Sequence, residues 1–285
     1  MVAQIGIITD STCDIPQDLI ERYTIGVVPM MLTWGDRLYR DRVDLQPGEF
    51  YTRLATNRES LHTSQPTATD FQQAFEHQAM QGASELCVMT LSSTLSGTYE
   101  SARQAARDFK LPITVVDTKG TSMGMGWQVL AAARAREAGA SVKGILENVN
   151  NVRKKITQMV GLDTMEYIQK GGRLGAAVKW AGSLLKIKPL VGFDPRTNLV
   201  EPIGLARSYK ALIDLLHKHF FSRLKGKKLL HIAVLHGGAL DTAQQLAQRI
   251  REECDPLELV INSTGPAVGI HTGPGALGLC GYSED

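Results

Sequence analysis

The chain has 285 residues, 43% hydrophobic and 21% charged, as in ordinary soluble globular proteins. Its 31 Lys and Arg and 29 Asp and Glu leave a net charge of +2, too balanced to indicate a nucleic-acid partner. No segment reaches the roughly 20 consecutive apolar residues of a membrane span, and the start lacks the features of a signal peptide. Four cysteines without zinc-like spacing favour a cytoplasmic protein over a secreted disulfide framework.

Short apolar segments alternate with helix-like segments along the chain. The predicted strands are Ile5–Thr9, Gly26–Trp34, Glu85–Leu91, Ile113–Asp117, Gln158–Leu162, Leu229–His236 and Leu257–Asn262. Several are continuously apolar, which is typical of parallel strands buried on both faces. Between them, Pro16, Thr69 and Ser141 are expected to begin helices. The alternation predicts an α/β fold with a mainly parallel sheet.

The second half of the chain departs from this alternation. Pro189–Phe193 and Leu199–Leu205 flank a turn at 194–198 and predict a hairpin, so the second sheet should be mixed. The length favours about two domains. We therefore predict a Rossmann-like α/β domain over residues 1–158 and a second α/β domain, a mixed sheet with helices, over 159–285. The basic segment Val152–Lys155 would connect them.

Hydroxyl side chains gather after several predicted strands. They occur in Asp10–Asp14, Ser92–Tyr99 and Asp117–Ser122, and a further predicted loop, Leu61–Thr67, adds more. Single hydroxyls of this kind commonly cap helices, as Ser93 and Ser96 could do. In open α/β sheets, however, ligands bind beyond the carboxyl ends of the strands. Four such loops together favour a pocket for a carboxylate or phosphate.

Two glycine-rich segments are also candidate site elements. Tyr167–Arg173 ends in Gly-Gly-Arg, where the glycines permit a sharp turn and Arg173 adds a fixed cation. The alternative is a helix C-terminus with a surface arginine. His271–Ala276 is a tight loop that begins with a histidine, which is either structural or faces a ligand.

Taken together, these motifs resemble those of the DegV family. The segments that carry the resemblance, in order, are Asp10-Ser-Thr with Asp14, Thr63-Ser-Gln-Pro66, Ser92-Ser-x-x-Ser-Gly-Thr98, Gly171-Gly-Arg173, Lys188-Pro189 and His271-Thr-Gly-Pro-Gly-Ala-Leu-Gly278. The resemblance extends from residue 5 to about residue 280. Cys13 departs from it, because the family often has a small hydroxyl residue there; we expect a buried or half-buried small side chain.

The resemblance implies the EDD fold, with a long-chain fatty acid bound between the two domains. It also implies a cytoplasmic, non-enzymatic subunit that presents the fatty-acid carboxylate to a separate ATP-dependent fatty acid kinase, in phospholipid metabolism. Acyl phosphate would form there, and transient contact with a membrane surface is a further implied property. The implied headgroup residues are Thr63, Ser64, Ser93, Ser96, Gly97 and His271. Arg173 and His271 would face the kinase, and no metal or cofactor beyond the fatty acid is implied.

Physical considerations agree with this role and leave two alternatives open. Burying a chain of ~16 carbons contributes at most about 12 kcal/mol, at ~0.8 kcal/mol per CH₂, so binding needs no salt bridge. The sequence has no GxxxxGK[ST] motif for ATP. One alternative is an acyl-ester hydrolase using Ser96 and His271, although Ser96 lacks the GxSxG context. The other is a small-anion-binding module.

Overall fold

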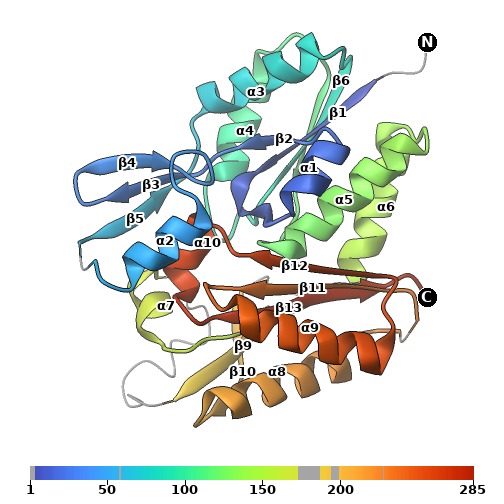
Figure 1. Ribbon diagram of the computed structural model, residues 1–285. Helices are drawn as coiled ribbons and strands as arrows, with labels where there is room; N and C mark the ends of the chain where they lie inside the picture. Colours follow the sequence, from blue (N-terminus) through green and yellow to red (C-terminus); the bar gives the residue numbers. More distant parts are fainter. Residues whose placement is uncertain (1–3, 58, 173–186, 194–198, 227) are drawn as a thin grey trace.

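The structure is a computed structural model that describes residues 4–57, 59–172, 187–193, 199–226 and 228–285. Figure 1 shows two lobes: an upper one built by the first half of the chain and a lower one built by the second half. Arg173 and the turn 194–198 of the predicted hairpin lie outside the described residues.

The first half of the chain forms a four-stranded parallel sheet, as the apolar runs predict. Its spatial order is β2-β1-β6-β7, with strands β1 (Ile5–Asp10), β2 (Gly26–Val28), β6 (Glu85–Thr90) and β7 (Ile113–Asp117). β1 is buried along its whole length, since helices cover the sheet. The helices of this half are η1 (Ser11–Cys13), α1 (Gln17–Arg22), α2 (Pro47–Leu54), α3 (Ala68–Met80), α4 (Thr98–Arg107), α5 (Met123–Glu137) and α6 (Val142–Lys155).

A separate three-stranded antiparallel sheet overturns two predictions. It has the order β4-β3-β5, with β3 (Met31–Trp34), β4 (Arg37–Arg40) and β5 (Leu61–Ser64). The prediction of one strand over Gly26–Trp34 is wrong, because Pro29, which has no N–H to donate, lies in the break between β2 and β3. The prediction of a loop over Leu61–Thr67 is also wrong, since its first four residues pair with β3.

The second half forms a mixed six-stranded sheet of order β10-β9-β8-β13-β11-β12. Its strands are β8 (Thr157–Gly161), β9 (Lys188–Phe193), β10 (Val200–Ala206), β11 (Leu230–His236), β12 (Glu258–Ser263) and β13 (Leu277–Ser283). β11 and β12 are parallel and the other neighbours antiparallel; the predicted pairing of β9 with β10 is confirmed. The helices are α7 (Glu166–Lys170), α8 (Tyr209–Arg223), α9 (Leu240–Cys254) and α10 (Pro266–Thr272). The domain division at 158/159 falls inside β8 and stays a prediction.

Side chains that cap the first backbone N–H groups set where helices α3 and α6 begin. Helix α3 begins after Thr67 rather than at the predicted Thr69: Asp70 N donates to Thr67 Oγ1 at 3.2 Å, and Thr67 N donates to the Asp70 carboxylate at 2.7 Å. This reciprocal capping box satisfies two backbone donors. Ser141 caps α6 as predicted, accepting from Gly144 N at 3.4 Å.

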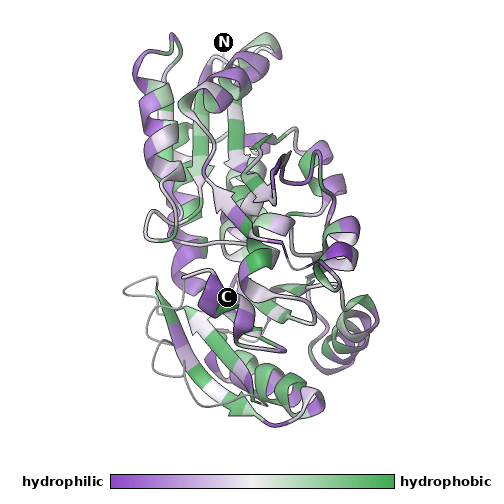
Figure 2. Ribbon diagram, turned by 90° about the vertical axis from the view of Figure 1, so that its left-hand side faces the viewer, coloured by the Kyte–Doolittle hydropathy of each residue, from purple (hydrophilic) through white to green (hydrophobic). Residues whose placement is uncertain are grey.

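The two lobes share a continuous hydrophobic core. Helix α5 is buried on nearly all sides because it packs between β1 of one lobe and β13 of the other. Trp127 on α5 also donates from Nε1 to the carbonyl of Cys280 at 3.2 Å. Figure 2 shows hydrophobic residues gathered on the strands and on the helix faces turned toward them. This shared packing places loops of the first lobe against α10 and the strands of the second.

Candidate functional site

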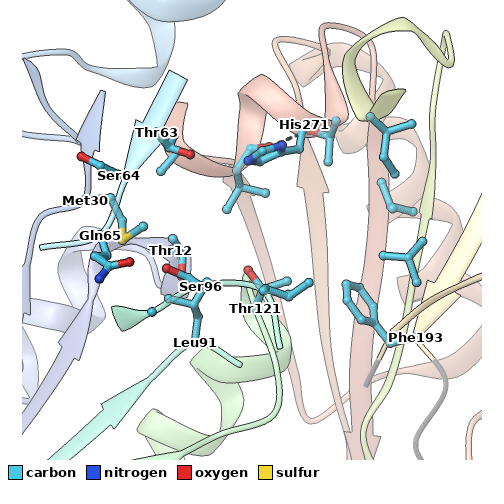
Figure 3. Close-up of a pocket in the computed structure, with 18 of the residues that line it drawn as sticks. Thr12, Met30, Thr63, Ser64, Gln65, Leu91, Ser96, Thr121, Phe193 and His271 are labelled. Carbon is cyan, nitrogen blue, oxygen red and sulfur yellow. Dashed lines mark hydrogen bonds between the residues drawn. The ribbon is translucent and has the colours of Figure 1, made fainter. Parts of the chain in front are cut away.

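A mainly apolar cavity of about 340 Å³ lies where the two lobes meet, a volume typical of small-molecule sites. Figure 3 shows side chains from both lobes pointing into it. The lining consists of Thr12, Met30, Thr63, Ser64, Gln65, Leu91, Leu95, Ser96, Gly97, Thr121, Val160, Ile168, Val191, Phe193, Val200, Ala267, Val268, His271 and Thr272. Among these described residues, His271 is the sole side chain of an acidic or basic type.

A smaller chamber of about 60 Å³ adjoins this cavity. The two spaces share lining residues, including Val160, Phe193 and Val268. Beyond them, the chamber is lined largely by apolar residues of the six-stranded sheet, among them Leu235 and Leu279. The apolar space therefore extends from the main cavity into the second lobe.

An outer cavity of about 440 Å³ adjoins the main cavity on another side. It shares Thr63 and His271 with the main cavity, and its other walls carry polar groups such as Glu59, Glu166 and Lys170. Figure 3 shows the Thr63 hydroxyl and the His271 ring pointing toward one another. These two residues therefore lie between the mainly apolar main cavity and an outer cavity that also carries charged side chains.

The position of Thr63 follows from the alternation of a β-strand. On β5, Leu61 and Thr63 are half-buried, while His62 and Ser64 are exposed. Thr63 pairs with Leu32 of β3, which fixes its register. Ser64 and Gln65 at the end of the strand also line the cavity.

His271 lies in the last turn of α10. Ala267, Val268, His271 and Thr272 follow helical spacing along one side of α10 and line the main cavity. The predicted tight loop therefore begins as the end of a helix. A Cβ atom at Gly171 would overlap His271 Nδ1, so glycine at the end of α7 permits their close approach.

Ser96 and Gly97 lie between β6 and α4. The Ser96 and Thr98 hydroxyl oxygens are 2.9 Å apart, and Thr98 N donates to Ser96 Oγ at 3.3 Å. Gly97 is the N-cap residue of α4. A Cβ there would lie 2.5 Å from Gln65 Oε1, so glycine lets the Gln65 amide approach this loop.

Ser93 is placed differently from the other expected headgroup residues. Its hydroxyl donates to Asp117 Oδ2 at 2.6 Å, and it is absent from the described lining of the cavity. It does not cap α4 either, because Gly97 occupies the N-cap position. The position of Arg173 lies outside the described residues, so its predicted role remains a prediction.

Several lining residues have no role in the sequence predictions. Thr12 and Thr121 lie in hydroxyl-rich loops that the sequence had indicated, whereas Gln65 follows the Thr-Ser pair directly. Met30 and Leu91 carry no polar signal, and only the fold shows that they reach the cavity.

A buried carboxyl group and a buried thiol lie behind the residues that line the main cavity. Burial raises the pKa of Asp10 to about 6, although its carboxylate accepts hydrogen bonds from Thr12 and from Leu91 N. Cys13 is 3% exposed, which confirms the expected burial. Burial raises the pKa of its thiol to about 12, so Cys13 is neutral and unsuited to nucleophilic attack.

The described part of the chain holds neither a metal-ligand cluster nor a helix that could span a membrane. Within it, no three His, Cys, Asp or Glu residues are grouped as a metal site would require. Within it too, every helix is too short or too polar to cross a bilayer.

Comparison with known proteins identifies the family. A family model described as "Uncharacterised protein, DegV family" matches residues 4–284. The chain belongs to the DegV family. A DegV domain-containing protein of Staphylococcus aureus (strain COL) is 33% identical over 273 residues, 96% of each chain. One of Streptomyces coelicolor is 33% identical over 280 residues, 98% of each chain.

Solved DegV structures share the fold along the whole chain. A DegV family protein from Thermus thermophilus, described as binding fatty acid, is 32% identical with a TM-score of 0.90, covering 98% of this chain and 99% of that one. DegV from Bacillus subtilis, described as a fatty acid binding protein, is 26% identical with a TM-score of 0.90, covering 99% and 100%. This DegV chain therefore has the two-lobed α/β fold that its motifs predict.

Proposed function

We propose that this DegV protein binds one long-chain fatty acid, with the tail buried in the main cavity and the adjoining chamber. The observation that carries the proposal is an apolar cavity with hydroxyl groups and one histidine at its polar side. Burial contributes roughly 0.8 kcal/mol per CH₂, which supplies most of the affinity. The DegV proteins of T. thermophilus and B. subtilis, described as fatty-acid binding, support the same ligand class.

The carboxylate is assigned to Thr63, Ser96 and His271. Thr63 and Ser96 offer neutral hydrogen-bond donors, and His271 offers a ring nitrogen from α10. Ser64 and Gly97 complete this end of the cavity, whereas Ser93 is omitted because its hydroxyl bonds to Asp117. Neutral donors can orient the carboxylate while leaving an oxygen available as a nucleophile.

The second part of the proposal is that the carboxylate is presented to a separate ATP-dependent fatty acid kinase. The outer cavity supports this, because it shares Thr63 and His271 with the main cavity and gives a partner a route to the carboxylate. Arg173 would then face the transferred phosphoryl group. The proposal further includes a cytoplasmic location, transient contact with a membrane surface, and a role in phospholipid metabolism.

Ligand titration separates this function from its alternatives. Lipid-stripped protein is titrated with hexadecanoate, hexadecanol or inorganic phosphate, and binding is followed by native mass spectrometry and calorimetry. We expect hexadecanoate to bind one per chain, hexadecanol to bind more weakly, and phosphate not to bind. Binding of phosphate but not hexadecanoate would instead favour a small-anion module.

The hydrolase alternative has its own test. The Ser96 hydroxyl lies beside Thr98 at 2.9 Å, so the geometry gives the hydrolase no specific support. We expect no turnover of a nitrophenyl ester beyond that of a Ser96→Ala variant. Acyl phosphate should form only when fatty acid, ATP and the kinase are all present, and its formation without the kinase would contradict the presentation role.

A further inference from the structure

Three carboxylates, those of Asp10, Asp14 and Asp41, form a buried layer behind the cavity, and each residue is 1% exposed or less. The Arg42 guanidinium lies near Asp14 and Asp41 and donates to Asp14 Oδ1 at 2.6 Å. Buried carboxylates are costly unless they are well hydrogen-bonded. Their hydrogen-bond partners therefore indicate what the layer holds in place.

Asp41 joins two elements that line the cavity. Ser11 Oγ donates to Asp41 Oδ2 at 2.6 Å and accepts from Met30 N at 2.9 Å. On the other side, Ala267 N in the first turn of α10 donates to Asp41 Oδ1 at 3.2 Å. Met30 belongs to the first half of the chain and Ala267 to the second, and both line the cavity. Through Ser11, the Asp41 carboxylate thus links the two halves at the cavity wall.

Asp14 also links the two halves of the chain. Its Oδ1 accepts from Gly265 N at 2.8 Å, and its Oδ2 accepts from Ser122 Oγ at 2.5 Å. Arg42 also donates to the carbonyl of Ser263 at 2.8 Å. The backbone that leads into α10 is therefore held by side chains of the first lobe, and α10 carries His271 near its other end.

We propose that Asp41 is a positioning residue of the fatty-acid site, whose ionised carboxylate holds Met30 and α10 in the arrangement that binds the acyl chain. This inference rests on the proposed fatty-acid binding. The 2.6 Å contact with Ser11 is typical of a hydroxyl that donates to a charged carboxylate. A protonated carboxyl would keep one fewer acceptor for the two donors.

Burial disfavours the ionised form of Asp41 in the folded protein, so its effect on ligand binding can be measured separately from its effect on stability. Burial raises its pKa to about 7, against the lowering effect of Ser11 and Arg42. The other titratable or charged groups near this layer are Arg42, Asp10 at the end of β1, Cys13 on η1, Asp14 directly after η1, and Tyr51 on α2. Because the raised pKa opposes ionisation, a neutral replacement should relieve that penalty while losing the charged acceptor.

The test compares Asp41→Asn with Glu258→Gln at pH 8. Glu258 is a matched control, because it also joins the lobes, accepting from Arg134 at 2.8 and 2.9 Å, but does not line the cavity. We expect Asp41→Asn to weaken hexadecanoate binding about fivefold without lowering Tm, as one lost hydrogen bond implies. Glu258→Gln should lower Tm and leave affinity unchanged. An Asp41→Asn protein that binds like wild type would overturn the proposal.

A second variant and a comparison of affinities across pH test the same role of Asp41. Ser11→Ala removes the link to Met30 and should also weaken binding about fivefold; this variant decides the matter if Asp41→Asn does not fold. The ratio of wild-type to Asp41→Asn affinity should fall toward one between pH 8 and pH 5.5, as Asp41 becomes protonated in the wild type. A constant ratio would reject the ionised carboxylate as the acting group. Wild-type protein that binds no fatty acid would refute the proposed function itself.

Discussion

Thr63 and His271 come from opposite halves of the chain and line the same two cavities, the mainly apolar main cavity and an outer cavity whose walls also carry charged side chains. Thr63 lies on β5 and His271 in the last turn of α10, and Figure 3 shows their polar atoms directed toward one another. A ligand with an apolar tail and an anionic head fits this boundary, because its two ends require different surroundings.

Replacing Thr63 with Val removes the hydroxyl and keeps the side-chain shape. We expect hexadecanoate affinity to fall about fivefold, since a neutral hydrogen bond contributes about 1 kcal/mol. Kinase-coupled acyl-phosphate formation should fall further, because orientation of the carboxylate matters more than affinity. Calorimetry and the coupled assay measure the two effects. Thr52→Val, on the exposed side of α2, is the control; equal behaviour of both variants would remove Thr63 from the headgroup site.

A charge in the apolar wall should prevent binding. Val268 lines both the main cavity and the adjoining chamber, so an aspartate there would face the acyl chain without a partner. We expect Val268→Asp to weaken hexadecanoate binding by roughly 100-fold or more. Val43→Asp, at a valine that is 53% exposed, should bind normally. Native mass spectrometry of the two purified variants gives the comparison, and full occupancy in Val268→Asp would show that the tail lies elsewhere.

Gly171→Ala tests the contact between α7 and α10. The added Cβ would overlap His271 Nδ1, whereas a Cβ at Gly48 would meet nothing within 4 Å. We expect Gly171→Ala to displace the His271 ring and weaken binding roughly tenfold, as loss of a hydrogen bond to a charged group implies. Gly48→Ala should have no effect. Fluorescence titration with a labelled fatty acid measures both, and unchanged affinity in Gly171→Ala would assign His271 a structural role only.

Arg173 is predicted to act on the kinase side of the site. An Arg173→Ala protein should keep its fatty acid, because a cation that acts on the kinase side would add little to the burial of a hydrocarbon chain. It should lose acyl-phosphate formation, because a cation there would stabilise charge that develops on the phosphoryl group. Arg103→Ala, at an exposed arginine paired with Glu100, serves as the control. Loss of fatty acid in Arg173→Ala would place the arginine at the carboxylate instead.

The buried acids give the protein a specific dependence on pH. The folded-state pKa of Asp10 is raised by burial from 3.8 to about 6. Its contribution to stability is therefore fully present below pH 3.8 and is lost as the pH rises through about 6. We expect Asp10→Asn to reduce the loss of stability between pH 4 and pH 7.5. Urea unfolding at both pH values gives the change in the free energy of unfolding between them. A change in Asp10→Asn equal to that of wild type would contradict the raised pKa.

The parallel sheet can be predicted from local sequence. β1, β6 and β7 are apolar runs followed by hydroxyl-rich turns. Burial on both faces produces that pattern in β1 and β6, whereas β7, at the edge of the sheet, is half-buried along its length. β5 was missed because its four residues, Leu-His-Thr-Ser, contain one apolar side chain, and pairing with β3 makes it a strand. β13 was missed because glycines interrupt its apolar residues.

The candidate site was predictable only where its residues form motifs. Thr63, Ser96 and His271 lie in motifs that the sequence displays, and the structure brings all three to one cavity. Ser93 lies in the same motif as Ser96, but bonding to Asp117 directs its hydroxyl elsewhere. Met30 and Ala267 are linked through hydrogen bonds to Ser11 and Asp41. These residues are up to more than 200 positions apart in the chain, so no local sequence pattern predicts the link.

The most direct test of the central claim is a crystal structure of the protein with hexadecanoate bound. We predict carboxylate oxygens within hydrogen-bond distance of the Thr63 and Ser96 hydroxyls, beside His271, with the acyl chain passing Phe193 toward the chamber lined by Leu235 and Leu279. A carboxylate in that chamber with the tail directed toward Thr63, or a fatty acid bound outside the cavity, would contradict the account.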